Sequence, residues 1–187
     1  GMAQGRNQHA RPEFDALGIP FEEKGPRTLE YLQAMRAIWT QPQPAYHGKF
    51  VSFSGVQSSP RPVQQPHPPI ILGGMSPFAY RRAVSHGNGW YGWSLDIEGT
   101  KKCLAGLRKA AQRSERPKEL GELEISITPA GRLDRDMVKQ YAELGVHRLI
   151  PLPTEPSGAE LAALMKLSES DVLNSVRQIG DTLIGRV

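Results

Sequence analysis

The sequence predicts an α/β fold in which about four parallel strands alternate with helices, and three observations support this class. Short apolar segments such as residues 69–72 show no polar alternation, which is typical of strands buried on both faces. Segments with apolar residues at helical spacing separate these strands. Strands that alternate with helices are typical of right-handed βαβ units and a parallel sheet.

The first third of the chain predicts one helix and a proline-rich loop. Thr28 is a suitable helix N-cap with Glu30 in the first turn, and apolar residues follow at helical spacing: Leu29, Leu32, Met35 and Ile38. Residues 40–69 form a proline-rich insertion, which we expect to be mostly extended loop. Within it, aromatic and β-branched residues around a glycine predict a short hairpin over residues 46–53.

The remaining chain predicts the alternating strands and helices. We expect strands at residues 69–72, 90–93, 123–128 and 147–152. The intervening helices begin near Pro77, Ile97 and Met137, and the first and third end at Gly87 and Gly145. Two further helices close the chain, the last with one apolar face: Val172, Val176, Ile179 and Leu183.

Composition predicts a single soluble domain over residues 1–187. The fractions of hydrophobic (39%) and charged (22%) residues are sufficient for a packed core. The longest apolar run, residues 70–72, is far too short to span a membrane, and no secretion leader opens the chain. The single cysteine, Cys103, excludes an internal disulfide framework, so we expect a cytoplasmic protein.

The charge distribution argues against a nucleic-acid partner. The formal net charge is +4, and basic residues concentrate between Lys101 and Lys118. This segment fits either a phosphate-backbone footprint or the solvated face of an amphipathic helix. Because no aromatic residues lie among the charges, the sequence favours the solvated face.

The best candidate binding site is the segment Gly73, Gly74, Met75 and Ser76, between a predicted strand and a predicted helix. Two glycines allow close approach of the backbone to an anion, and the following helix start offers N–H groups with a partial positive charge. Ser76 is suited to cap the helix or to donate its hydroxyl. The segment therefore predicts a phosphate cradle, with a simple tight turn as the alternative.

Gly89 and Trp90 form the second candidate site. Trp90 on a strand is able to stack on a planar cofactor, although a buried core position is the commoner role for tryptophan. The five histidines lack the spacing of a metal site, so we expect no metal. No nucleophile elbow, Walker loop or dinucleotide fingerprint is present, and the catalytic residues stay unassigned.

An ordered set of motifs resembles the luciferase-like monooxygenase family. It runs from Glu13 to about Leu152, and its members include Gly18-x-Pro20-Phe21-Glu22-Glu23, Arg27-Thr28-x-Glu30-Tyr31-Leu32, Met35-Arg36-Ala37-x-Trp39, Tyr46-x-Gly48, Pro60-x-Pro62-x-Gln64-x-Pro66-x-Pro68-Pro69-Ile70, Gly73-Gly74-x-Ser76 and Gly89-Trp90. The resemblance implies an oxidoreductase on a (β/α)8 (TIM) barrel. The cofactor implied is FMN or a deazaflavin (coenzyme F420), with its phosphate at Gly73, Gly74, Met75 and Ser76 and with Gly89 and Trp90 close by.

The resemblance covers only the C-terminal half of that barrel, so the chain is expected to form a half barrel. A half barrel exposes two strand edges and the side chains that would fill the barrel centre. We therefore expect a homodimer, or a partner chain that covers the open sheet. The functions implied are an oxidoreductase active as an assembly, a flavin-phosphate-binding module without catalysis, or an inactive remnant or partner subunit. The sequence does not identify a substrate.

Overall fold

The computed structural model describes residues 11–131, 133–153 and 167–184. The chain divides into two compact units, Gly1–Pro69 and Ile70–Val187, which we describe separately. The single domain expected over residues 1–187 stays a prediction. Among the described residues, no helix is both long enough and apolar enough to cross a membrane.

The first unit contains α2 (Arg11–Ala16), the short 3-10 helix η1 (Phe21–Glu23), α3 (Lys24–Thr40) and a two-stranded hairpin. The predicted start of α3 at Thr28 is wrong, because the helix begins four residues earlier. Pro26 fits there, since the first turn of a helix needs no N–H from that position. Thr28 lies inside the helix, and its hydroxyl donates to the carbonyl of Lys24 at 2.6 Å.

The predicted hairpin is confirmed as β1 (Tyr46–His47) paired antiparallel with β2 (Ser52–Phe53). The carboxylate of Glu30, on α3, accepts the backbone N–H groups of Lys49, Phe50 and Val51 at 3.1, 2.6 and 2.8 Å. A Cβ at position 48 would collide with this carboxylate, which explains the glycine there. The hairpin turn therefore depends on a single acidic side chain of α3.

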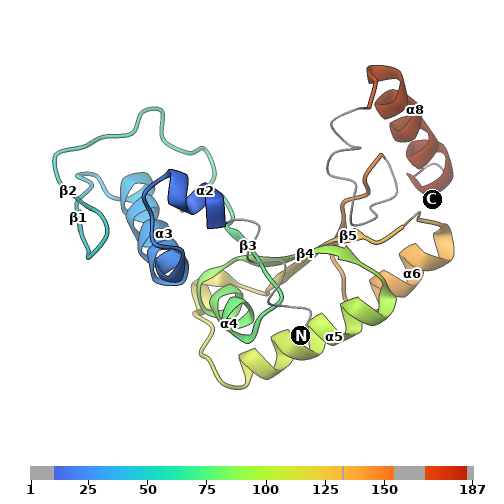
Figure 1. Cartoon of the computed structure of the whole chain (residues 1–187), viewed down its shortest axis with the longest axis horizontal. Coiled ribbons are helices and arrows are strands. Elements are labelled where there is room, and N and C mark those ends of the chain that lie inside the picture. Colours follow the sequence, from blue (N-terminus) through green and yellow to red (C-terminus); the bar gives the residue numbers. More distant parts are fainter. Residues whose placement is uncertain (1–10, 132, 154–166, 185–187) are drawn as a thin grey trace. The chain divides into compact units, whose positions relative to one another are not determined.

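The second unit contains the predicted parallel sheet, with strand order β3-β4-β5-β6 (Figure 1). Its strands are β3 (Ile71–Gly73), β4 (Gly89–Leu95), β5 (Glu124–Pro129) and β6 (Arg148–Leu149). Each strand pairs with the next one in the chain, and all pairs are parallel. The prediction of four parallel strands alternating with helices is confirmed, although β6 is shorter than expected.

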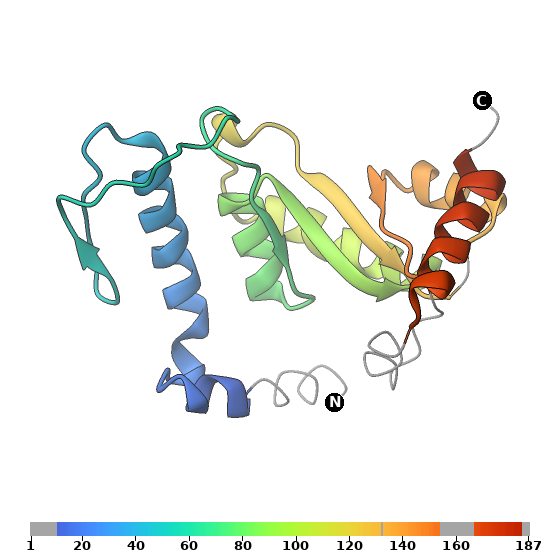
Figure 2. The ribbon, with the colours of Figure 1, turned by 90° about the horizontal axis from the view of Figure 1, so that it is seen from above.

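Three helices follow the first three strands: α4 (Pro77–His86), α5 (Ile97–Ala111) and α6 (Arg135–Glu143). They lie on one face of the sheet (Figures 1 and 2). A side-chain oxygen caps the start of each helix, and the capping residues are Ser76, Asp96 and Asp134. A short 3-10 helix, η2 (Lys118–Leu120), precedes β5.

The chain closes with α8 (Glu169–Ile179), which continues as a π-helical turn, η3 (Gly180–Ile184). Ser168 and Asp171 form a capping box at its start. The first of the two predicted closing helices falls among residues 154–166, which lie outside the described residues. The predicted apolar face of α8 is divided, because Ile179 and Leu183 are half-buried while Val172 and Val176 are exposed.

The core lies between the sheet and its three helices. Trp90, Ile127 and Tyr141 are fully buried there, together with Val84 and Leu107. The hydroxyl of Tyr141 donates to the carbonyl of Leu95 at 2.7 Å. The same carbonyl also accepts the N–H of Ala130 at 2.9 Å, so the group that depends on this bond is the buried hydroxyl of Tyr141. The hydrogen bond ties α6 to the end of β4 from within the core.

The opposite face of the sheet carries polar side chains. Arg148 pairs with Glu124 at 3.2 Å, and the hydroxyl of Ser126 donates to the same carboxylate at 3.0 Å. Further along the strands, the hydroxyls of Tyr91 and Thr128 lie 2.7 Å apart. This face therefore has its own ordered polar layer.

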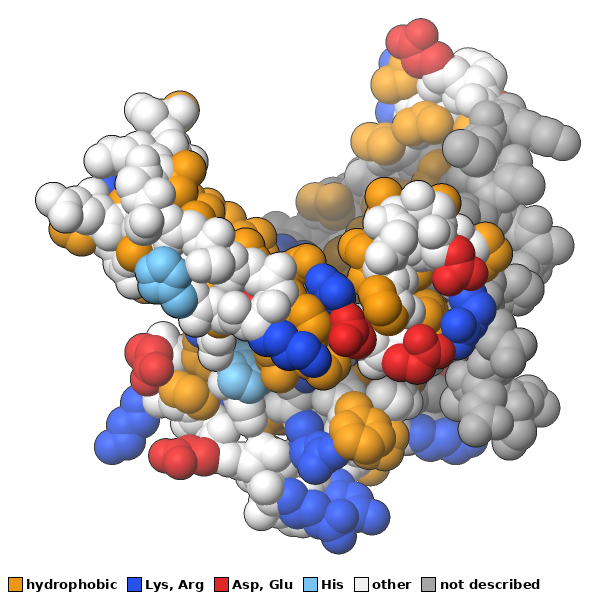
Figure 3. All heavy atoms as spheres, turned by 60° about the vertical axis from the view of Figure 1, so that its left-hand side comes forward, with side chains coloured by type: hydrophobic (Ala, Val, Ile, Leu, Met, Phe, Trp, Pro, Cys, Tyr) orange, Lys and Arg blue, Asp and Glu red, His pale blue; other side chains and the backbone are white. Residues whose placement is uncertain are grey.

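The basic segment between Lys101 and Lys118 divides into two parts. Lys101, Lys102 and Lys109 are exposed on α5. Arg116 instead donates to the carbonyls of Val84, Gly87, Leu120 and Gly121, and burial lowers its pKa. On the face drawn in Figure 3, charged side chains of both signs lie among hydrophobic ones.

We predict that the stability of the hairpin turn depends on pH through the carboxylate of Glu30. Desolvation raises the pKa of Glu30, but the three N–H donors lower it by more, so the net pKa lies below its usual range. The stabilisation is therefore complete above the unfolded pKa, about 4.3, and is lost as the pH falls through the lower folded pKa. Hydrogen-exchange protection of the Phe50 and Val51 amides should fall in this range.

The matched control is Glu30→Gln, which removes the titrating group and keeps an acceptor oxygen. Its amide protection should be lower at neutral pH and should show no step on acidification. A step of equal size in this variant would contradict the role assigned to Glu30.

Candidate functional site

The carboxyl ends of the four parallel strands lie at one edge of the sheet. Because the strands run in the same direction, β3 ends there at Gly73, β4 at Leu95, β5 at Pro129 and β6 at Leu149. Ligands of parallel α/β proteins bind at this edge, where the following helices direct their N-termini. The candidate site therefore comprises the loops that follow these strands.

The loop after β3 is the predicted cradle, and its backbone has a conformation that favours glycine. Gly74 has a φ of +109°, and a Cβ there would lie 2.8 Å from the Cβ of Ala79. The hydroxyl oxygen of Ser76 accepts the N–H of Ala79 at 3.2 Å and caps α4, with Pro77 at the first helical position. Gly73, Gly74, Met75 and Ser76 are all exposed. The turn thus exposes its backbone to solvent at the start of α4, with few side chains to cover it.

Gly89 lies at the other end of its strand, away from this turn. It is the first residue of β4, it pairs with Ile71 and it is buried. A Cβ there would lie 2.7 Å from the carbonyl oxygen of Glu124 on the neighbouring strand. The glycine therefore permits close approach of β4 and β5, and the structure does not bring it to the carboxyl edge.

Trp90 occupies the core, the commoner of its two predicted roles. Its side chain is fully buried, and its ring centroid lies 5.9 Å from that of Tyr80. Its indole Nε1 donates to the carbonyl of Gly74 at 2.9 Å. The indole therefore holds the cradle in place from behind, and neither its face nor its N–H group is available to a ligand.

Sequence reasoning missed Trp93, the tryptophan that is exposed at the carboxyl edge. Its exposed fraction is 39%, whereas that of Trp90 is 0%. A β-bulge between Gly92 and Leu95 follows, and Ser94 within it has a φ of +49°. Since alternate residues of a strand point to opposite faces, the odd spacing between the two tryptophans was the signal that could have identified Trp93.

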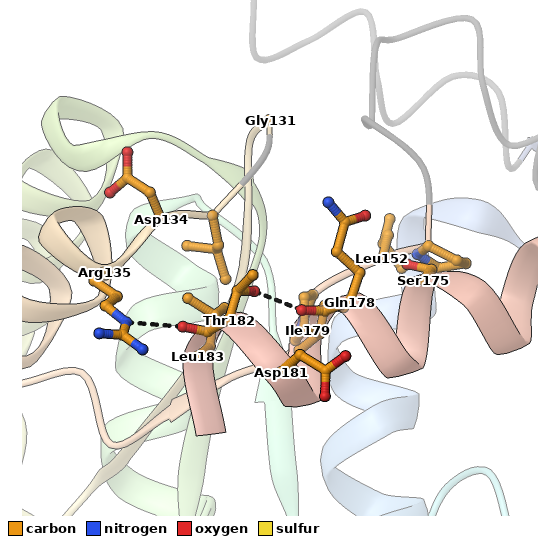
Figure 4. A pocket seen from close by; sticks show the side chains of 13 residues that line it. Gly131, Asp134, Arg135, Leu152, Ser175, Gln178, Ile179, Asp181, Thr182 and Leu183 are labelled. Atoms are coloured by element: carbon orange, nitrogen blue, oxygen red, sulfur yellow. Dashed lines mark hydrogen bonds between the residues drawn. The ribbon is translucent and has the colours of Figure 1, made fainter. Parts of the chain in front are cut away.

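A cavity of about 760 Å³ opens beyond the ends of β5 and β6 (Figure 4). The sequence analysis did not predict it. Its apolar lining comes from the loop after β5, the loop after β6 and the closing helix: Leu133, Pro151, Leu152, Pro153, Ile179 and Leu183. Its polar lining includes Asp134, Arg135, Gln178 and Asp181. These segments are separated in the chain, so no local sequence pattern predicts the cavity.

Hydrogen bonds already engage several of the polar groups around this cavity. Asp134 accepts the N–H of Met137 at 2.8 Å as the cap of α6. Arg135 donates from Nε to the carbonyl of Thr182 at 2.9 Å, which ties α6 to η3 (Figure 4). Among the described residues, no group of three histidine, cysteine, aspartate or glutamate side chains is placed to hold a metal ion.

This chain is similar to known proteins of one family. The profile of the luciferase-like monooxygenase family matches residues 2–170. An FMNH2-dependent dimethylsulfone monooxygenase of Pseudomonas putida is 34% identical over 113 residues, which cover 58% of this chain and 31% of that protein. An uncharacterized protein of Mycobacterium tuberculosis is 30% identical over 152 residues, which cover 80% of this chain and 51% of that protein.

A solved structure shares the fold. The monooxygenase RslO1 from Streptomyces bottropensis superposes with a TM-score of 0.51 at 22% sequence identity, over 89% of this chain and 47% of that chain. The present chain therefore spans about half the length, or less, of the proteins that it matches here.

The two tryptophans should differ in their effect on stability. Trp90→Phe removes the hydrogen bond to Gly74 from the core, so we expect the free energy of unfolding to fall by about 1–3 kcal/mol. Trp93→Phe, at an exposed position, should change it by less than about 0.5 kcal/mol. Urea unfolding followed by circular dichroism measures both. Equal effects of the two substitutions would contradict the assignment of Trp90 to the core support of the cradle.

Proposed function

Because this chain belongs to the luciferase-like monooxygenase family, we propose that it forms the cofactor-phosphate half of a flavin-dependent monooxygenase. The observation that carries the proposal is the turn Gly73–Ser76. In this turn Gly74 has a φ of +109°, and two glycines without side chains leave the backbone open to a ligand. The turn also leads into the start of α4 at the carboxyl edge of the sheet. A phosphate fits these features, because backbone N–H groups and the helix dipole both favour an anion there.

We propose FMN as the cofactor in place of a deazaflavin. The relative from Pseudomonas putida is named as an FMNH2-dependent enzyme, which supports this choice. The turn itself addresses only the phosphate end that both cofactors share. When bound, the flavin ring supplies the redox chemistry with oxygen, and the protein supplies binding and orientation.

The residues of this chain divide into three roles in the proposed site. The backbone at Gly73 and Gly74 and the hydroxyl of Ser76 would hold the phosphate. Trp90 supports this turn from the core, and Gly89 sets the spacing of the strands behind it. Trp93 takes the place first assigned to Trp90 beside the ring, since it is the exposed aromatic side chain at that edge.

We propose that a second copy of the chain covers the open face of the sheet. Four strands are half of the eight in a closed β/α barrel. The polar layer on that face, which contains Glu124, Ser126 and Arg148, would fill the barrel interior opposite the second half. A separate partner chain that supplies the other four strands is the alternative, as the greater length of the relatives suggests.

We expect the purified chain to bind FMN more tightly than riboflavin, by about tenfold. Riboflavin lacks the phosphate, and a charge-assisted hydrogen bond contributes about 1.5–3 kcal/mol. Gly74→Val should remove this preference, because its side chain meets Ala79 and forces the turn to move. Fluorescence titration of both flavins, and absorbance titration of a deazaflavin, measure the affinities.

The matched control is Gly145→Val. Gly145 also has a positive φ, +86°, and an added Cβ would meet no atom within 4 Å. This control should keep the preference for FMN. Equal binding of FMN and riboflavin by the unmodified chain would contradict a phosphate site at the turn, and tighter binding of the deazaflavin would contradict the choice of FMN.

The proposed assembly has a separate test. Sedimentation equilibrium at micromolar concentration should give the mass of a dimer, and Arg148→Glu should shift it toward the monomer. The reason is that the reversed charge faces Glu124 in the layer that the second copy would bury. A monodisperse monomer of the unmodified chain would remove the homodimer from the proposal.

A further inference from the structure

The cavity beyond β5 and β6 has the size and the lining of a small-molecule site. Its volume of about 760 Å³ lies within the range of about 300–1,000 Å³ that ligand pockets occupy. Its apolar walls come from two sides, with Leu133 and Leu152 on the strand loops and Ile179 and Leu183 on the closing helix (Figure 4). All four side chains are half-buried, so a ligand there would remove further apolar surface from water.

The polar groups of the cavity select against a charged ligand. Among the described residues that line it, Asp134 and Asp181 are acidic and Arg135 is basic. The oxygen Oδ1 of Asp134 caps α6, and Nε of Arg135 binds the carbonyl of Thr182. At these described residues, an anion would meet two carboxylates against one engaged guanidinium, and a cation would give up its hydration beside the apolar side chains.

Gln178 is the neutral polar side chain best placed to form a hydrogen bond with a ligand. It extends from α8 in the direction of the Gly131 turn, and its amide end is not part of the hydrogen bonds drawn in Figure 4. The hydroxyl of Thr182, in contrast, is used within the helix, where it donates to the backbone carbonyl of residue 178 at 2.6 Å. A side-chain amide offers N–H donors to one acceptor oxygen on a ligand.

The cavity lies at the same edge of the sheet as the cradle. The cradle follows β3, Trp93 stands on β4, and the cavity follows β5 and β6. Neighbouring strands are about 4.8 Å apart, so the cavity lies about 10–15 Å along the edge from the cradle. Trp93 therefore lies between the cradle and the cavity in the order of the strands along this edge.

We infer that this cavity is the substrate site, and that it takes an uncharged, mainly apolar organic molecule with one hydrogen-bond acceptor oxygen. The role as substrate site rests on the proposed function. The binding itself rests on the apolar walls, the engaged side chains of Asp134 and Arg135, and the amide of Gln178. Leu133 and Ile179 provide the walls on the two sides, and Gln178 orients the acceptor oxygen.

Three small probes test the ligand class: acetophenone, benzoate and ethylbenzene. They share a benzene ring and differ in the substituent, which is a neutral acceptor, an anion or a hydrocarbon. In amide-resolved NMR titrations, acetophenone should shift signals from residues 131–135 and 175–183. Benzoate should bind at least about tenfold more weakly, because its charge must be desolvated beside carboxylates.

Two pairs of variants test the position. Ile179→Trp fills the cavity and should weaken acetophenone by at least about tenfold, whereas Val176→Trp, at an exposed position that does not line the cavity, should leave binding unchanged. Gln178→Leu should weaken acetophenone by about three- to tenfold and leave ethylbenzene unaffected. Its control is Asn174→Leu, an exposed position that does not line the cavity. Gln178 is exposed, so its substitution leaves the fold intact.

The inference is overturned if acetophenone shifts no signals around the cavity, if benzoate binds equally well, or if neither Ile179→Trp nor Gln178→Leu weakens acetophenone. An FMN titration of Ile179→Trp separates this result from the proposed function, since FMN affinity should stay within about threefold. Binding of acetophenone without any FMN binding would support the ligand site and overturn its role as substrate site. Binding of FMN without acetophenone would overturn this inference alone.

Discussion

The common direction of the four strands is the constraint on which the candidate site depends. Parallel strands bring every carboxyl end to one edge, so the turn after β3, the bulge in β4 and the loops after β5 and β6 lie in order along it. An antiparallel strand would send its loop to the opposite edge. The helices that return the chain on one face also direct their N-termini to this edge, which makes it suitable for an anion.

The core holds this edge in position through backbone carbonyls. Trp90 binds the carbonyl of Gly74, and Tyr141 binds that of Leu95, so two large buried side chains each satisfy a polar atom at the site. The same contacts satisfy the polar groups of the indole and the phenol inside the core. Packing and site geometry are therefore coupled, and a loosened core would displace the cradle together with the end of β4.

The face of the sheet away from the helices follows a different rule. It carries hydroxyl groups and the pair of Arg148 with Glu124, where the helix-covered face carries tryptophan and isoleucine. Charged groups are seldom placed on a surface that packs against aliphatic side chains, because their desolvation is costly. This polar layer is consistent with the interior of a larger barrel. The matched proteins, about twice as long as the matched part of this chain, are long enough to contain a whole barrel.

Features that depend on local backbone preferences could be predicted from the amino-acid sequence. Apolar runs fixed the strands, Ser76 and Pro77 fixed the start of α4, and Gly74 marked a turn that other residues disfavour. The alternation of a strand places Trp90 and Trp93 on opposite faces, but the packing of the helices on the sheet determined which of the two is buried. The cavity also depends on tertiary packing, because it joins the loops after β5 and β6 to the closing helix. Contacts between segments that are distant in the chain decide such features, and local backbone preferences do not specify these contacts.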